Sequence, residues 1–223
     1  LATLREVARR GKPIVVVNPM RERGLERFRS PKNPADMLAG RQTLLATHYF
    51  QPRVGSDPLL LQGVMKRLLE MADTQPAVLD RAFIAAHTSG FEDLAAELRA
   101  LDWDAVQAAT GLAAADFAQL AGIYAAADSS IVAYGMGITQ HRHGTANVHQ
   151  VANLLLLRGN IGRPGAGICP VRGHSNVQGD RTVGINERPP PEFLDRLDRA
   201  FGIRAPREPG VTVVECIEAM AGG

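Results

Sequence analysis

The segment with the most capacity for chemistry runs from residue 134 to residue 185. It carries ten glycines together with arginine, histidine, asparagine and glutamine side chains. Glycine lets the backbone approach a ligand closely, and the polar side chains supply hydrogen-bond donors. A hydrophobic core needs neither property, so this segment predicts a surface that lies against a large, polar, anionic ligand.

Two parts of this segment are candidate binding loops. The first, Gly135-Met136-Gly137-Ile138-Thr139-Gln140, follows an apolar run and resembles a degenerate dinucleotide-binding fingerprint with Gln140 in place of the third glycine. Its glycines would let the backbone approach a diphosphate. The second, residues 169–180, has donors at nearly every second position, including Arg172, Gly173, His174 and Gln178. An arginine there would hold a carboxylate or phosphate through two parallel hydrogen bonds.

Two shorter candidates precede this segment, and each has a plainer alternative. Asn18 ends an apolar run, where its amide would accept from a ribose hydroxyl or a base edge, or would simply form an Asn-Pro turn. Gly55-Ser56-Asp57 precedes a helical pattern. Either it is an ordinary helix N-cap, or Asp57 accepts from a guanine while nearby backbone amides face phosphate.

No metal ligand is expected among these residues. His141, His143 and His149 have no carboxylate or thiolate beside them, so anion contact or solvation is the better interpretation. The two cysteines, Cys169 and Cys216, form no CxxC motif. Neither an iron–sulfur cluster nor a structural zinc site can therefore be built from this chain.

The elements that must position these loops alternate between strands and helices. Buried parallel strands are expected at 14–17 and 129–134, and helices at 2–10, 57–71, 76–88, 90–101, 113–127 and 146–158. Residues 20–47 are expected to be low in regular structure and residues 159–190 mostly irregular, with turns at Trp103 and Gly111. Thr212 and Glu215 fit a capping box for a last helix to about Ala221, against a strand over 211–214. Alternating strands and helices predict a three-layer α/β fold with a mainly parallel sheet, whose ligands bind beyond the carboxyl ends of the strands.

The composition is that of a soluble globular protein. Of 223 residues, 45% are hydrophobic and 22% charged, and the net charge is +2. That charge is too small to indicate a nucleic-acid partner, and no apolar run approaches the roughly 20 residues that span a bilayer. A cytoplasmic protein with no membrane span is expected.

The stretch GMGITQHRHGTANVHQVANLLLLRGNIGRPGAGICPVRGHSNVQG closely resembles the molybdopterin-dependent oxidoreductases of the dimethyl sulfoxide reductase superfamily, in particular the formate dehydrogenase-type catalytic subunits. Looser matches lie upstream in VVVNP, GSDPLLL, AFIAAHTSGFEDL and ATGL. The resemblance covers roughly residues 1–188. It implies that 1–188 is a Rossmann-like domain binding molybdopterin guanine dinucleotide, and that 189–223 is an extension toward the next domain.

The resemblance also implies a cofactor and roles for the candidate residues. In that family, molybdenum or tungsten is held by two pterin guanine dinucleotides. Asn18, Gly55 and Asp57 would hold a guanosine, and Gly135, Met136, Gln140, Gly173 and Gln178 would contact the dinucleotides. Arg172 matches the family arginine beside the metal, which contacts both substrate and cofactor, and His174 would relay a proton. Two-electron chemistry on a small molecule would result.

The departures from the family pattern qualify this interpretation. His174 stands where formate dehydrogenases have glutamine, which leaves the substrate open, and residues 20–47 replace a shorter connection. The family's metal ligand and any iron–sulfur cluster would lie upstream of Leu1. We therefore expect an internal fragment, inactive alone, whose partners are the rest of the catalytic subunit and electron-transfer subunits. A non-catalytic descendant without metal is the alternative. A nicotinamide-binding Rossmann domain is disfavoured because the full fingerprint is absent.

Overall fold

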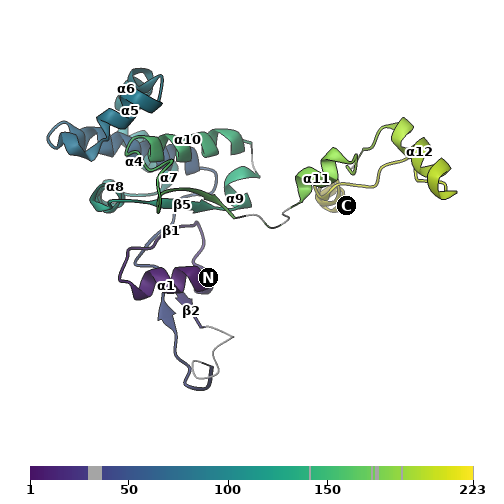
Figure 1. The fold of residues 1–223 in the computed structure, drawn as a ribbon, viewed down its shortest axis with the longest axis horizontal. Coiled ribbons are helices and arrows are strands. Elements are labelled where there is room, and N and C mark those ends of the chain that lie inside the picture. Colours follow the sequence, from purple (N-terminus) through teal and green to yellow (C-terminus); the bar gives the residue numbers. More distant parts are fainter. Residues whose placement is uncertain (30–36, 141, 172, 174–175, 187, 223) are drawn as a thin grey trace. The chain divides into compact units, whose positions relative to one another are not determined.

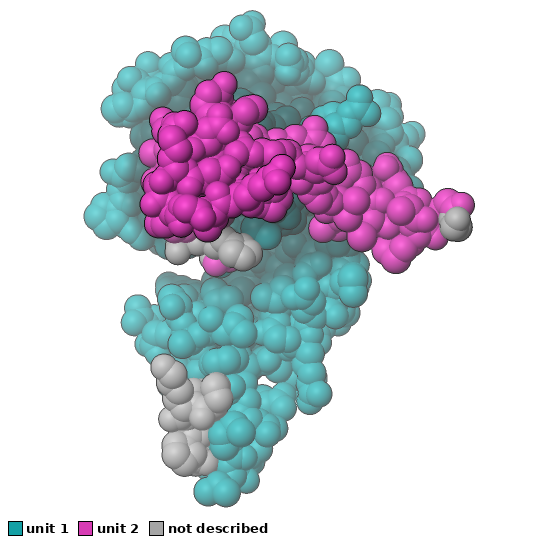
Figure 2. Space-filling model, turned by 90° about the vertical axis from the view of Figure 1, so that its right-hand side faces the viewer, with its two compact units in different colours: residues 1–171 teal, residues 172–223 magenta. Residues whose placement is uncertain are grey.

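A computed structural model describes residues 1–29, 37–140, 142–171, 173, 176–186 and 188–222. The chain divides into two compact units, Leu1–Val171 and Arg172–Gly223, which Figure 2 colours separately. Each is described by itself. The expected domain boundary at residue 188 stays a prediction.

The first part of unit 1 is built on a parallel strand pair. Its elements are α1 (Ala2–Arg9), β1 (Val15–Val17), α2 (Arg23–Glu26), β2 (Arg27–Phe28), β3 (Thr43–Leu44) and β4 (His48–Phe50). β1 pairs with β4 in parallel, with Val17 opposite Phe50, and β2 pairs with β3 antiparallel. Residues 20–47 were expected to have little regular structure, and α2, β2 and β3 within this range have two to four residues each. Val17 is 42% exposed, so β1 is not buried on both faces.

The core of unit 1 is a group of helices around α4. These are α4 (Asp57–Ala72), the 3-10 turn η1 (Pro76–Val78), α5 (Arg81–His87), α6 (Phe91–Ala100), α7 (Trp103–Thr110) and α8 (Ala114–Ala126). α4 packs against α6, α7, α8 and α10 (Gly144–Leu156). Gly63 allows the close approach to α8, since a Cβ there would lie 2.6 Å from Phe117 Cε1.

One core helix, α7, was missed by the sequence analysis. Trp103 was expected to mark a turn, but it is the first helical residue because the Asp102 carboxylate accepts the Ala105 amide at 2.8 Å. Gly111 does end the helix, with a left-handed φ of +73°.

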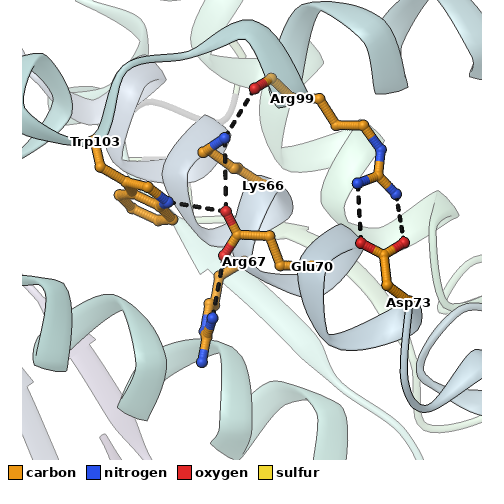
Figure 3. Close-up of polar contacts among 6 residues, drawn as sticks. All are labelled: Lys66, Arg67, Glu70, Asp73, Arg99 and Trp103. Carbon is orange, nitrogen blue, oxygen red and sulfur yellow. Dashed lines mark hydrogen bonds and ion pairs between the residues drawn. The ribbon is translucent and has the colours of Figure 1, made fainter.

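A polar cluster joins α4 to α6 and α7 (Figure 3). Lys66 is only 7% exposed, and its Nζ donates to the Arg99 carbonyl at 2.9 Å. The Glu70 carboxylate lies 3.6 Å from Lys66 Nζ and accepts from Trp103 Nε1 at 2.9 Å and from Arg67 at 3.1 Å. Burial alone would raise the pKa of Glu70, but the hydrogen bonds from Trp103 and Arg67 and the charge of Lys66 hold it below its ordinary value.

The second parallel pair lies under α10. β5 (Ile131–Tyr134) pairs in parallel with β6 (Gly167–Pro170), α9 (Met136–Thr139) and α10 connect them, and Figure 1 shows α10 running alongside β5. Gly159, with φ +59°, ends the turn that follows α10, as its type predicts. Residues 159–190 were expected to be mostly irregular, and the short strand β6 within them was not predicted. The expected burial of β5 was wrong, since Ile131 is 61% exposed.

Unit 2 contains three described helices, α11 (Val177–Thr182), α12 (Pro191–Phe201) and α13 (Val213–Gly222). The first two were not predicted. The capping box of α13 is confirmed, because the Thr212 amide donates to the Glu215 carboxylate at 2.6 Å and the Glu215 amide donates to Thr212 Oγ1 at 3.2 Å. The alternative strand at 211–214 was therefore wrong.

The mixed α/β class is confirmed. The described strands form three two-stranded sheets, two of them parallel, and helices alternate with the strands of the parallel pairs. In the described part of the chain, no helix combines the length and the apolar character needed to cross a membrane.

Candidate cofactor-binding site

The carboxyl ends of β5 and β6 bring together two segments that are far apart in the sequence. Tyr134 lies opposite Pro170, and the Val171 amide continues the ladder by donating to the Tyr134 carbonyl at 2.7 Å. A Cβ on Gly135 would lie 3.6 Å from the Val171 carbonyl oxygen. The glycine loop after β5 and the chain leading into Arg172 therefore start from the same edge, as expected for parallel strands.

The loop after β5 is held in place by α10. Asn147 is fully buried, and its Nδ2 donates to the Ile138 carbonyl at 2.8 Å. A Cβ on Gly144 would lie 2.1 Å from the Thr139 carbonyl oxygen, so only glycine permits this contact. α9 is thus fixed on the first turn of α10.

Two predicted cofactor contacts, Met136 and Gln140, lie on this fixed loop. Both are exposed, and Met136 is 43% accessible. The backbone amide of Gln140 donates to the Met136 carbonyl at 2.7 Å, which closes the single turn of α9. Among the described residues, the Gln140 side chain has no hydrogen-bond partner, so it is available to a ligand.

Asn18 lies where the parallel strands β1 and β4 end. The Asn18 amide donates to the Phe50 carbonyl at 3.0 Å, directly after the last strand pair. Asn18 Oδ1 accepts the Met20 amide at 3.1 Å, which is the turn geometry of the plainer alternative. The side-chain amide of Asn18 remains half-buried at this edge.

The Gly55-Ser56-Asp57 turn follows β4 and leads into α4. The Ser56 amide donates to the Arg53 carbonyl at 3.2 Å, and Gly55, at the third position of the turn, has φ +84°. Ser56 occupies the N-cap position, but its hydroxyl donates to the Arg53 carbonyl at 2.6 Å instead of capping α4. Within the described residues, the half-buried Asp57 carboxylate has no hydrogen bond or ion pair.

The remaining predicted residues belong to unit 2. Arg172 and His174 lie outside the described residues, Gly173 is exposed, and Gln178 lies in α11. Their roles stay predictions. In the described ranges, no group of three or more His, Cys, Asp or Glu side chains could hold a metal ion, and Cys169 and Cys216 are exposed and free.

A buried polar network that the sequence analysis missed supports the β5–β6 pair. Asn160 is fully buried, donates to Tyr124 Oη at 3.0 Å and accepts from the Ser130 amide at 3.2 Å and from Arg163 at 2.8 Å. Tyr124 Oη donates to the Leu154 carbonyl at 2.9 Å, and burial raises the pKa of this hydroxyl. The available signal was an asparagine directly after the glycine that ends an apolar helix.

The family model for "Molybdopterin oxidoreductase" matches residues 31–221. The chain belongs to the molybdopterin oxidoreductase family. The resemblance found in the sequence is thereby confirmed, and a molybdopterin-type cofactor is implied.

Two curated proteins illustrate what this chain is similar to. Protein YdeP of Escherichia coli (strain K12) is 48% identical over 228 residues, which cover 100% of this chain and 30% of that protein. Putative formate dehydrogenase YrhE of Bacillus subtilis (strain 168) is 29% identical over 85% of this chain and 20% of its own length. This chain thus spans about a third of the length of YdeP.

A solved structure shares the fold. Acetylene hydratase from Pelobacter acetylenicus superposes with a TM-score of 0.59 over 74% of this chain and 19% of that one, at 18% sequence identity. At this identity the likeness concerns the fold alone.

Proposed function

We propose that this chain binds guanine nucleotide portions of a bis(molybdopterin guanine dinucleotide) cofactor carrying molybdenum or tungsten. The observation that carries the proposal is the position of the candidate loops. Asn18 and Gly55–Asp57 follow the parallel strands β1 and β4, and Gly135–Gln140 follows β5. Loops beyond the carboxyl ends of parallel strands are where such folds bind nucleotides. On this proposal residues 1–188 form a Rossmann-like domain, and 189–223 extend toward another domain.

The described residues fit a nucleotide in their donors and acceptors. The unpartnered Asp57 carboxylate suits the N1 and 2-amino donors of guanine, and the first-turn amides of α4 have no side-chain cap, which suits an anionic group. Gly135, Met136 and the side-chain amide of Gln140, which has no partner among the described residues, would face a second dinucleotide. Arg172, Gly173 and Gln178, which belong to unit 2, are proposed as further cofactor contacts.

We further propose a formate dehydrogenase-like oxidoreductase acting on a small molecule. When bound, the metal centre supplies the two-electron chemistry, while the protein supplies position and electrostatics. Arg172 would orient an anionic substrate by paired hydrogen bonds, and His174 would hold or release a proton near neutral pH. The name of the relative YrhE supports the formate-like class. The proposal includes a cytoplasmic location, electron-transfer partners, an iron–sulfur cluster held by other residues, and inactivity of this chain alone.

The nucleotide proposal is tested by cofactor analysis of the protein purified from its native host. We expect molybdenum or tungsten by elemental analysis, and two guanosine monophosphates per metal after acid hydrolysis. Asp57→Asn should lower the released nucleotide, whereas Asp93→Asn, on the exposed side of α6, should not. A well-folded protein with neither metal nor guanine nucleotide would instead support the non-catalytic descendant.

A further inference from the structure

Arg53 joins the end of α7 to the turn that begins α4. Its backbone amide donates to the Thr110 carbonyl at 2.8 Å, and its Nη1 donates to the Ala108 carbonyl at 2.5 Å. Both carbonyls belong to the last turn of α7, where a helix leaves its acceptors unpaired. The guanidinium charge there also complements the negative end of the helix dipole.

Gly111 makes this contact possible. Its φ of +73° lies in the left-handed region that ends α7, and a Cβ on it would lie 3.2 Å from Arg53 Cγ and 3.3 Å from Arg53 Nε. The Arg53 side chain therefore crosses the end of α7 at a distance that a larger residue would disturb. The Arg53 side chain is therefore held against the end of α7 by its contacts with Ala108 and Gly111.

The carbonyl of Arg53 fixes the turn on the other side. It accepts both the Ser56 amide, at 3.2 Å, and the Ser56 hydroxyl, at 2.6 Å. Ser56 is 8% exposed, so this arrangement is largely shielded from water. Because the hydroxyl donates to the Arg53 carbonyl, it does not cap α4, and the first-turn amides of Asp57 and Leu59 stay available, Pro58 having none.

We propose that Arg53 is a positioning residue for guanine nucleotide binding at Gly55–Asp57. The inference rests on the proposed function, because it names the device that holds that same turn. Arg53 does not itself contact the nucleotide. It fixes the turn to α7, and so keeps the Asp57 carboxylate and the α4 amides at a constant separation before the nucleotide arrives. A preorganised site loses less ordering entropy on binding.

The test measures guanosine diphosphate binding by calorimetry to the full protein, purified from a host strain that cannot make the pterin cofactor. Arg53→Ala should weaken binding about tenfold, whereas Arg53→Lys, which keeps the charge and one donor, should restore most of the affinity. Arg158→Ala is the matched control, because Arg158 also donates to two backbone carbonyls, those of Val78 and Ala127. It should lower the melting temperature but leave the dissociation constant within about twofold.

Hydrogen exchange supplies an independent readout. Amides in residues 55–61 should exchange faster in Arg53→Ala, but not in Arg158→Ala. If Arg53→Ala lowers only the melting temperature, with unchanged affinity and exchange, Arg53 is a plain helix cap and the inference fails while the proposed function stands. If the unaltered protein binds no guanosine diphosphate, the nucleotide proposal and this inference fail together.

Discussion

The buried Asn160 side chain donates a hydrogen bond to Tyr124 Oη at 3.0 Å, which ties the loop after α10 to α8. Tyr124 Oη in turn donates to the Leu154 carbonyl. Asn160 Oδ1 accepts the backbone amide of Ser130, the residue directly before β5. These groups are shielded from bulk solvent, because Asn160 is fully buried and Tyr124 is 9% exposed. The network therefore fixes where β5 begins, and with it the loop that follows.

Removing the Tyr124 hydroxyl should destabilise unit 1. Tyr124→Phe leaves Asn160 Nδ2 and the Leu154 carbonyl without this partner, which costs about 1–3 kcal/mol for buried groups. Urea unfolding followed by the fluorescence of Trp103, the single tryptophan of the chain, measures the loss. Gln119→Ala, on the exposed side of α8, is the control and should change stability by less than about 0.5 kcal/mol. Equal stability of Tyr124→Phe and the unaltered chain would show that the network is not needed.

Gly144 should not tolerate a side chain. A Cβ there would meet the Thr139 carbonyl oxygen at 2.1 Å, so Gly144→Ala must push α9 away from α10. We expect a loss of about 1–3 kcal/mol in unfolding free energy, measured by urea denaturation. Gly122→Ala in α8 is the matched control, since a Cβ on Gly122 would meet no atom within 4 Å, and it should stabilise by about 0.5–1 kcal/mol. A neutral Gly144→Ala would contradict the close packing of α9.

The long helices were predictable because their signals are local. The apolar stripe of α4, the left-handed Gly159 after α10 and the Thr212–Glu215 capping box each act within a few residues of chain. The short strands β1 and β5 were also predicted, from their apolar, β-branched runs. β4 and β6 were not, because they lack such a run and are defined by the partner that each one pairs with. α7 was missed although its Asp102 cap is a local signal, because the packing of Trp103 against the core is not visible in the sequence.

The candidate site was predictable to a similar extent. Glycine loops after parallel strands indicate where a ligand binds, and the structure does bring Gly135 beside Val171 and Asn18 beside Phe50. What positions the Gly55–Asp57 turn could not be seen in the sequence. Arg53 lies 57 residues before Thr110 in the chain, and only the packing of α7 brings them together.

Glu70 should make the stability of unit 1 depend on pH in the acid range. Since its pKa in the folded chain lies below the ordinary value of 4.5, it contributes stability above that value, and this is lost as pH falls through the folded pKa. Glu70→Gln also leaves the buried Lys66 ammonium without its counter-charge, so we expect a loss of about 1–2 kcal/mol at pH 7.

Urea unfolding between pH 7 and pH 3 measures this contribution. The difference between Glu70→Gln and the unaltered chain should be full above about pH 5 and should vanish as the Glu70 carboxylate is protonated. Glu97→Gln, on the exposed side of α6, should show no such dependence. A constant difference across the range would mean that the Glu70 charge is not the cause.

His174 should set the preference of the proposed active site. The formate dehydrogenases that the sequence resembles carry glutamine at this position, so His174→Gln should raise formate-dependent reduction of benzyl viologen by the metal-loaded protein about tenfold. The neutral glutamine amide cannot take up a proton, whereas histidine titrates near pH 6.5. The rate should therefore also lose a pH dependence in that range.

A second substitution tests whether Arg172 orients the anionic substrate. Arg172→Ala in the His174→Gln background should lower the rate about a hundredfold with metal content retained, since a charge-assisted contact made to the reacting anion is lost. Arg196→Ala, on the exposed side of α12, controls for loss of a positive charge alone and should leave the rate within about twofold. If Arg172→Ala changes neither rate nor metal content, Arg172 does not orient the substrate. If His174→Gln gains no formate activity, the residue at 174 does not decide which small molecule this site accepts.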